Sequence, residues 1–243
     1  MTTAASEVSS KAKTHPGRCS NLIRLVNPFA VMTLWLSLCF LGAGRINWIA
    51  GWICAGVYAV AMMVAGAVVT RSNPALMDAR MDWRHHPMTK FDKIILAFYL
   101  PLTFLQPFVG GLDAGRFHWL LVPPIALIPG VLLFVAAMGL VVWTMTMNPF
   151  AESTVRIQAE RGHHVVTGGP YRFVRHPMYL GMVLMYPATA LMLGSGWAMV
   201  VAGVMAVLLI WRTAQEDIFL TRELSGYREF TTYTRFRLVP GLW

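Results

Sequence analysis

Long apolar runs with almost no charge divide this 243-residue sequence, and they limit the folds open to it more than any other feature. The runs cover residues 25–44, 48–70, 94–112, 119–147 and 178–211. About 20 apolar residues are enough to cross the ~30 Å hydrocarbon core of a bilayer as a helix. Only 13% of the residues are charged, whereas soluble proteins carry roughly 25%. The sequence therefore predicts an all-α integral membrane protein.

The last apolar run is too long for one crossing. At ~1.5 Å per residue, residues 178–211 would form a helix about 51 Å long. Gly194-Ser195-Gly196 lies near the middle of this run and offers a break. We therefore expect two short helices joined by a tight turn, a membrane hairpin, and about six transmembrane helices in total.

The positive residues support six spans with both ends of the chain in the cytosol. In that arrangement 18 of the 20 Lys and Arg residues are cytosolic, and only Arg45 and Arg116 lie outside. Five spans would move the C-terminal segment to the other side. We expect a disordered cytosolic tail at 1–24, four transmembrane helices within 25–147 and, as the candidate functional region, a cytosolic loop, the membrane hairpin and a cytosolic C-terminal segment at 148–243. The expected location is a bacterial inner membrane.

Several classes of function lack the residues they need. The net charge is +9, but the basic residues are sorted by loop and do not form one face for nucleic acid. Cys19, Cys39 and Cys54 have no metal-ligand spacing, so no metal is expected. The sequence has no G-x-G-x-x-G after a strand, no Walker loop and no H-E-x-x-H. Neither Ser153 nor Ser195 has the Gly-x-Ser-x-Gly context of a hydrolase.

A polar, basic stretch at residues 163–181 separates the apolar runs. Rings and hydrogen-bond donors in such density cross a bilayer poorly, but they suit an anionic or zwitterionic ligand at its surface. Two glycines before a proline also indicate backbone brought close to another group. The residues concerned are His163, His164, Gly168, Gly169, Arg172, Arg175 and His176.

An anchoring role explains part of this stretch equally well. Arg175 and His176 suit the headgroup layer, and Pro177 suits the first turn of the next helix. A second polar group, Arg212 with Glu216-Asp217, has a similar alternative as an exposed i,i+4 pair at a helix end. Ionisable residues at the membrane boundary are nonetheless candidates for function. The role of the His85-His86 loop stays open.

These two polar groups together resemble a known family. The stretch Gly169-Pro-Tyr-Arg-Phe-Val-Arg-His-Pro-Met-Tyr-Leu-Gly181, followed by Arg212-x-x-x-Glu216-Asp217 and Gly226-Tyr227, resembles the isoprenylcysteine carboxyl methyltransferases. The wider group includes the membrane phospholipid methyltransferases. The resemblance covers roughly residues 163–243, and Asn148-Pro-Phe150 is similar to the bacterial branch.

The resemblance implies an integral-membrane enzyme that uses S-adenosyl-L-methionine. It places the cofactor at the cytosolic face, under the C-terminal segment, and implies a path between helices for a lipid-like acceptor. Arg212 matches a position facing the acceptor, Arg156 matches a cofactor contact of different residue type, and Asp217 stands where the family usually has a second Glu. Arg212 and Glu216 are therefore the expected catalytic residues. The implied cofactor-binding residues are His163, His164, Val165, Val166, Tyr171, His176, Pro177, Met178, Tyr179 and Glu216.

The chemistry of methyl transfer agrees with these residues. In-line displacement from a sulfonium requires chiefly the positioning and desolvation of two reactants. Arg212 could orient an anionic acceptor with two parallel hydrogen bonds. Glu216 could accept from the cofactor's ammonium or ribose hydroxyls, and Tyr171 or Tyr179 could face the sulfonium or the adenine.

Two other functions remain open from the sequence. Membrane sterol reductases are similar in their C-terminal helices and use NADPH. A transporter or scaffold is the non-enzymatic alternative, but the apolar runs contain no Asp, Glu, Lys or Arg between their ends, which disfavours an ion pathway. The expected partners are membrane lipids and a lipophilic or small acceptor, such as a carboxylate, a thiol or a lipid.

Overall fold

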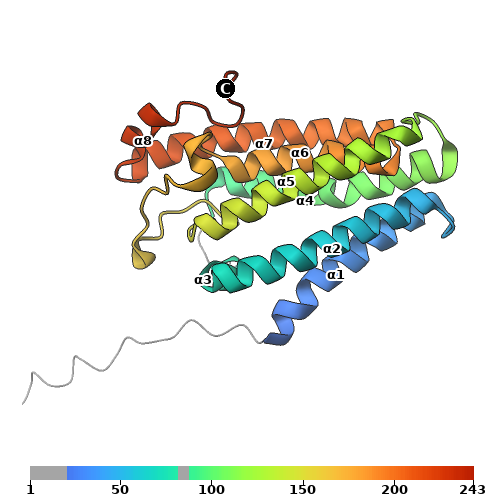
Figure 1. Cartoon of the computed structure of the whole chain (residues 1–243), viewed down its shortest axis with the longest axis horizontal. Helices are drawn as coiled ribbons and strands as arrows, with labels where there is room; N and C mark the ends of the chain where they lie inside the picture. The colour runs from blue at the N-terminus through green and yellow to red at the C-terminus, as the bar shows by residue number, and fades with distance from the viewer. Residues whose placement is uncertain (1–20, 82–87) are drawn as a thin grey trace, which may run out of the picture.

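The computed structural model describes residues 21–81 and 88–243 (Figure 1). Within this part of the chain the secondary structure is helical, with one isolated bridge between Leu121 and Ser195. The predicted tail at 1–24 falls almost wholly outside the described residues, as does the His85-His86 loop. The all-α prediction is confirmed for the described residues.

Long helices lie side by side and form one bundle (Figure 1). Four helical stretches are long and apolar enough to cross a membrane, namely Ile49–Ser72, Lys90–Phe117, Pro124–Met147 and Gly196–Glu223. Two shorter apolar helices, Ala30–Ala43 and Pro177–Leu193, occupy the places of the other expected spans, so the count of six stays a prediction. The α-helices are α1 (Asn21–Ala43), α2 (Ile49–Ser72), α3 (Pro74–Met81), α4 (Lys90–Gly110), α5 (Leu127–Met147), α6 (Pro177–Leu193), α7 (Gly196–Glu223) and α8 (Tyr227–Tyr233).

The predicted membrane hairpin is present. α6 ends at Leu193, Gly194 takes a left-handed φ of 73°, and the Ser195 side chain caps α7 by accepting from the Ala198 N–H. A residue with positive φ ends a helix readily when it is glycine, which has no Cβ to clash. α7 then continues without a break to Glu223, twelve residues beyond the apolar run.

The fourth expected span begins later than the sequence indicates. It was expected from residue 119, but α5 starts only at Leu127. Residues 120–122 instead pair with the hairpin turn, since the Gly196 N–H donates to Leu120 O at 2.7 Å and the Val122 N–H to Gly194 O at 2.9 Å. Pro124, with no N–H to donate, then opens a short 3₁₀ turn that leads into α5.

Small residues let the central helices approach at backbone distance. A Cβ at Gly181 of α6 would lie 2.8 Å from the Ala137 carbonyl of α5, and one at Gly130 of α5 would lie 3.1 Å from the Ala188 carbonyl. Close approach through small residues is a common way for helices to associate in lipid, because the hydrophobic effect does not drive association between helices that are already in an apolar solvent. α5 and α6 therefore form the tightest pair of the bundle.

A buried carboxylate holds the hairpin turn at one end of the bundle. Asp113 lies in a π-helix, Gly111–Phe117, that continues α4. It accepts hydrogen bonds from the Leu120 N–H at 2.8 Å, the Ser195 hydroxyl at 2.6 Å and the Trp197 N–H at 3.1 Å. One side chain thus joins α4, the segment before α5 and the start of α7.

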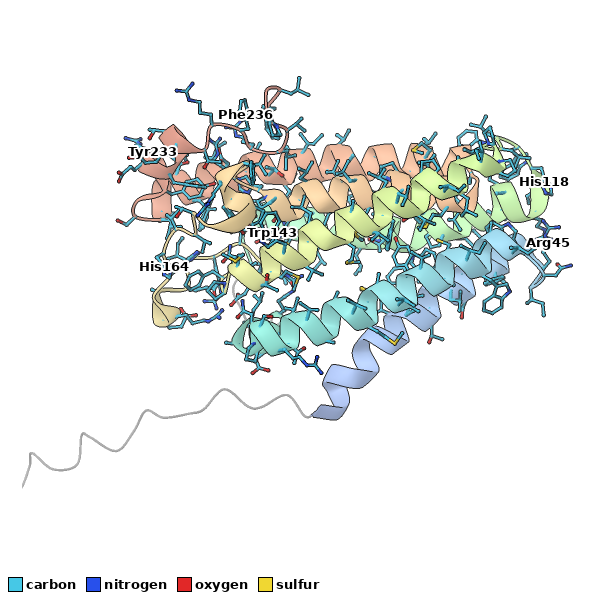
Figure 2. The ribbon with its side chains drawn as sticks, viewed as in Figure 1. Arg45, His118, Trp143, His164, Tyr233 and Phe236 are labelled. Atoms are coloured by element: carbon cyan, nitrogen blue, oxygen red, sulfur yellow. The ribbon has the colours of Figure 1, made fainter. Side chains whose placement is uncertain are left out.

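The polar segments gather at the other end. α3, α8 and the connection between α5 and α6 lie together there, and the C-terminal segment folds back over α7 (Figure 1). Figure 2 shows His164 and Tyr233 at this end, while Arg45 and His118 lie at the opposite end. The separation agrees with the expected sorting of charge, and the assignment of this end to the cytosol stays a prediction.

Candidate functional site

A hollow opens at the polar end, between the segment 148–166, the start of α6, the last turns of α7 and α8. Its volume is about 750 Å³ when the open mouth is included. Residues far apart in the sequence meet in its wall. Every cofactor position implied by the resemblance lines it: His163, His164, Val165, Val166, Tyr171, His176, Pro177, Met178, Tyr179 and Glu216.

The glycines before α6 seat the polar stretch against the end of α5. Gly169 has a φ of 58°, and a Cβ there would lie 2.9 Å from Met147 Cγ. The chain turns here into a 3₁₀ segment, Gly169–Arg172, and α6 begins with Pro177 as its first residue. The group that approaches this backbone most closely is thus a helix of the same protein.

The two polar groups of the sequence are in direct contact. The Tyr179 hydroxyl donates to Glu216 Oε2 at 2.5 Å. His176 lies between two carboxylates, with Nε2 3.2 Å from Asp217 Oδ1 and Nδ1 3.9 Å from Glu216 Oε1. Glu216 also keeps a partly exposed face in the wall of the hollow, so one oxygen can receive a ligand.

Asp217 is the centre of a buried charge cluster. Arg175 approaches it with Nε 2.9 Å from Oδ1, and the Arg237 Nε–H donates to Oδ2 at 2.9 Å. The Tyr227 hydroxyl donates to Oδ1 at 3.0 Å, beside His176. Charge-assisted bonds of this kind are the strong ones in proteins. Asp217 therefore joins α7 to the start of α6, to α8 and to the C-terminal segment.

The C-terminal segment 234–243 packs against the same place. The Arg175 N–H donates to Phe236 O and the His176 N–H to Arg237 O, both at 2.9 Å. Figure 2 shows Phe236 where this segment passes over the bundle. The backbone next to the candidate site is thus held by the end of the chain, which agrees with the expected position of the C-terminal segment.

Aromatic and apolar side chains that the sequence analysis did not select complete the wall. The Phe150 ring lies 4.5 Å from the His163 ring and 5.0 Å from the His164 ring, centroid to centroid. The buried Thr154 hydroxyl has no hydrogen-bond partner in the described part of the chain. The sequence signal for Phe150 is the motif Asn148-Pro-Phe150, which in the sequence analysis supports only the similarity to the bacterial branch. Further wall residues are Asn148, Arg175, Leu220, Leu224, Tyr227 and Phe230.

Arg156 also lines the hollow, but its guanidinium is engaged. Nε and Nη2 each donate to Glu152 at 2.9 Å, and Nη1 donates to Glu160 at 2.6 Å. Its interactions are those of a side chain that shapes the segment 148–166. A direct contact with a ligand requires one of these bonds to be exchanged.

Arg212 lies beside the hollow and not in its wall. Its Cζ is 5.5 Å from the centroid of the Tyr179 ring, and Nη2 donates to Asp92 Oδ1 at 3.0 Å and to Ser153 O at 2.8 Å. Within the described residues its ion-pair partner is Asp92, and not Glu216 four residues along the helix. The exposed i,i+4 pair of the sequence analysis is therefore wrong, because the side chain turns inward across the bundle.

Asp92 was missed by the sequence analysis. It is buried at the start of α4, where it accepts from the Thr89 hydroxyl at 2.9 Å and from the Val155 N–H at 3.0 Å besides Arg212. The Thr89 side chain in turn accepts from the Asp92 N–H. The spacing Thr89-x-x-Asp92 resembles a capping box and was the available signal.

The electrostatics of the wall favour a neutral His163. Burial lowers the pKa of His163, and the nearby positive charges of His164 and Arg156 lower it further. The Gln158 N–H donates to His163 Nδ1 at 3.3 Å, which requires an unprotonated nitrogen. At neutral pH this ring therefore presents a hydrogen-bond acceptor toward its own backbone.

Residues 125–225 match the family model described as phospholipid methyltransferase. The match covers less than half of the chain, and we call these residues, which are similar to that family, the family segment. It runs from the start of α5 through α7, so it contains the segment 148–166, the start of α6 and the Arg212–Asp217 turn. The match supports a membrane methyltransferase. No curated protein matches the chain.

The family segment does not contain the whole site. Tyr227 and Phe230 of α8 follow it, and Arg237 lies further on. Asp92, the partner of Arg212, precedes it by more than thirty residues. The described residues contain no group of His, Cys, Asp and Glu arranged to hold a metal ion.

Proposed function

We propose that this protein is an S-adenosyl-L-methionine-dependent methyltransferase that modifies a lipophilic or small acceptor at the cytosolic face of a membrane. One observation carries the proposal. The ten positions implied by the resemblance come from separate parts of the sequence, yet they line a single hollow within a phospholipid methyltransferase family segment.

The chemical groups of the hollow fit such a cofactor. Glu216 offers a carboxylate to an ammonium or to ribose hydroxyls, and the Thr154 hydroxyl, which has no partner among the described residues, would gain one from a bound ligand. Phe150, Tyr171 and the apolar wall residues suit an adenine ring. When bound, S-adenosylmethionine would supply an activated methyl group, which is transferred to a nucleophile while the C–S bonding pair leaves with sulfur.

The residues of the chain position the reactants and exclude water. Tyr179 lines the hollow on one side and carries the Arg212 guanidinium over its ring on the other. We therefore place the acceptor next to Arg212 and Tyr179, in direct contact with the cofactor. Two reactants held in one line gain much of the rate of a bimolecular reaction from positioning alone.

Calorimetry of the purified protein with S-adenosylhomocysteine tests the proposal. The wild type should bind one equivalent, and NADPH should give no comparable signal. Folded wild-type protein that fails to bind S-adenosylhomocysteine would contradict the assignment. Binding of NADPH instead would favour the reductase alternative.

Substitution of Glu216 should mainly weaken cofactor binding, whereas substitution of Arg212 should mainly lower turnover. Glu216→Ala should raise the Kd for S-adenosylhomocysteine by about 10- to 100-fold, since a hydrogen bond to a charged group contributes roughly 1.5–3 kcal/mol. Arg212→Ala should leave that Kd within about threefold and lower kcat for methyl transfer. Glu223→Ala, at the exposed end of α7, is the matched control. Equal losses of affinity in both variants would reject these roles.

Cofactor affinity should fall in acid because of His163. The lowered pKa of this base means that it takes up a proton only as the pH drops below the ordinary value of 6.5. Protonation removes the acceptor for the Gln158 N–H and adds a positive charge beside Arg156. The Kd for S-adenosylhomocysteine should thus be constant from pH 7 to 8 and rise below pH 6.5.

Titrations of His163→Gln across the same pH range provide the check on that prediction. The variant should lose the rise in Kd, whereas His118→Gln, at the far end of the bundle, should keep it (Figure 2). An unchanged pH profile in His163→Gln would assign the acid sensitivity to another group.

A further inference from the structure

Two arginines from distant parts of the chain meet beside the candidate cofactor site. Arg80, on α3, donates from Nη1 to Ala151 O at 2.6 Å. Arg212, on α7, donates from Nη2 to Ser153 O at 2.8 Å. The two carbonyls are two residues apart in the segment 148–166, which also walls the hollow. Both guanidinium groups are therefore directed to the same short stretch of backbone.

One of the two guanidinium groups has a buried nitrogen that no described residue satisfies. Asp92 pairs with Arg212 through Nη2 at 3.0 Å, and Arg212 Nε is buried without a hydrogen-bond partner among the described residues. The hydrogen bond of Arg80 goes to the uncharged Ala151 carbonyl. Glu152, whose charge acts on Arg80, also binds Arg156 and Arg161.

The two guanidinium groups also affect each other. Burial lowers the pKa of Arg80 and the positive charge of Arg212 lowers it further, whereas Tyr179 and Glu152 act in the opposite direction. Like charges held together in this way are costly unless an anion joins them. Guanidinium groups present forked donors that match the oxygens of a carboxylate or a phosphate.

An apolar patch adjoins these charges. Leu76 and Met77 of α3 pack with Val69 at the end of α2, and Ala151 and Met178 belong to the same cluster. Leu76 is fully buried, so the cluster belongs to the interior of the bundle, and its partly buried members Met77 and Met178 are the ones that can present apolar surface to a ligand.

We propose that Arg80 and Arg212 together bind the oxyanion, a carboxylate or a phosphate, of an amphiphilic methyl acceptor. The identity of this ligand as the methyl acceptor rests on the proposed function, whereas the anion site itself rests on the contacts of the two arginines. Arg80 and Asp92 lie outside the family segment 125–225. The acceptor site is therefore shared between the N-terminal half of the chain, which supplies Arg80, and the family segment, which supplies Arg212 and most of the wall for the methyl donor.

Amphiphiles of equal chain length test the anion site. Laurate, dodecyl phosphate and uncharged dodecanol are titrated into the full-length protein in a non-ionic detergent, and Kd is measured by calorimetry. At least one anion should bind the wild type about 10-fold or more tightly than dodecanol. The preferred anion distinguishes a carboxylate acceptor from a phosphate-bearing lipid.

Variants of Arg80 assign the preference to this site. Arg80→Gln should weaken the preferred anion about 10-fold and leave dodecanol and S-adenosylhomocysteine unchanged. Arg80→Lys keeps the positive charge and should weaken binding of the preferred anion less than Arg80→Gln does. Arg71→Gln removes an exposed arginine from the last turn of α2, at the same end of the bundle, and should change none of the Kd values.

Three results would overturn the anion site: a wild type without preference for anions, an Arg71→Gln loss equal to that of Arg80→Gln, or an Arg80→Lys loss as large as that of Arg80→Gln. If Arg80→Gln does not fold, the site is overturned by a wild type without preference for anions, or by an Arg80→Lys loss no larger than that of Arg71→Gln. S-adenosylhomocysteine binding without anion preference rejects only this inference. Anion preference without S-adenosylhomocysteine binding rejects only the proposed function.

Discussion

Replacing Asp217 with alanine should destabilise the polar end of the protein and weaken binding of S-adenosylhomocysteine at least 10-fold. The substitution leaves Arg175 and Arg237 without their shared carboxylate, and it removes the acceptor of the Tyr227 hydroxyl. Removing one partner of a buried ion pair costs about 3–5 kcal/mol, because the remaining charge stays buried. We expect a loss of this size in the free energy of unfolding, measured by denaturant titration in detergent.

The loss of binding has a separate cause. Asp217 does not line the hollow, but it fixes His176 and the C-terminal segment that holds the backbone of that residue. Without it, the wall formed by the start of α6 loses its support. Kd should rise at least 10-fold at a temperature where the variant is still folded.

Two further substitutions at this position and its partner refine the result. Asp217→Glu keeps the charge and should retain most of the stability, whereas Arg237→Ala should release only the C-terminal segment and cost less. If Asp217→Ala bound S-adenosylhomocysteine like the wild type, the cluster would not support the site, and the C-terminal segment would have no part in binding.

Replacing Asp113 with alanine should destabilise the protein comparably while leaving the site intact. Three donors lose their acceptor: the Ser195 hydroxyl in a buried hydrogen bond, and the Leu120 and Trp197 N–H groups in part-buried ones. A buried donor left unsatisfied costs roughly 1–3 kcal/mol and the part-buried ones cost less, so the total should be about 3 kcal/mol. Ser195→Ala removes one of these donors and should cost about 1 kcal/mol.

The contrast with Asp217 makes this variant informative. Asp113 lies at the opposite end of the bundle from His176, so Kd for S-adenosylhomocysteine should change less than about threefold wherever Asp113→Ala is folded. A larger change in Kd would show that the two ends are energetically coupled. Stability equal to that of the wild type would mean that water satisfies the three donors.

The length of the last apolar run and the turn residues at its middle predicted the hairpin. A 34-residue apolar run exceeds the bilayer, and Gly194 supplied the conformation that ends α6. The start of α5 was not predictable in the same way. Residues 120–122 are apolar enough for a span, but their backbone pairs with the hairpin turn, a contact that no local pattern records.

The candidate site likewise has residues that the sequence predicts and residues that it does not. Its two polar groups stand out in the sequence because charge is rare at membrane boundaries, and the structure brings them within hydrogen-bond distance at Tyr179 and Glu216. Asp92, Phe150 and Arg237 carry no comparable signal. They reach the site only through tertiary contacts between distant segments, which hydrophobic periodicity does not encode.

The unbroken course of α7 has a consequence for how the hollow can open. This helix has 28 residues and is about 42 Å long, with Ser195 fixed at its first turn and Glu216 near its last. A helix anchored at its far end cannot slide along its own axis, so α7 is a fixed wall of the hollow. Any movement that widens the hollow for a ligand must come from the segment 148–166 and the C-terminal segment 234–243. The same helix makes the height of Glu216 above the lipid depend on bilayer thickness, because a thinner membrane tilts the helix and lowers the carboxylate toward the headgroups.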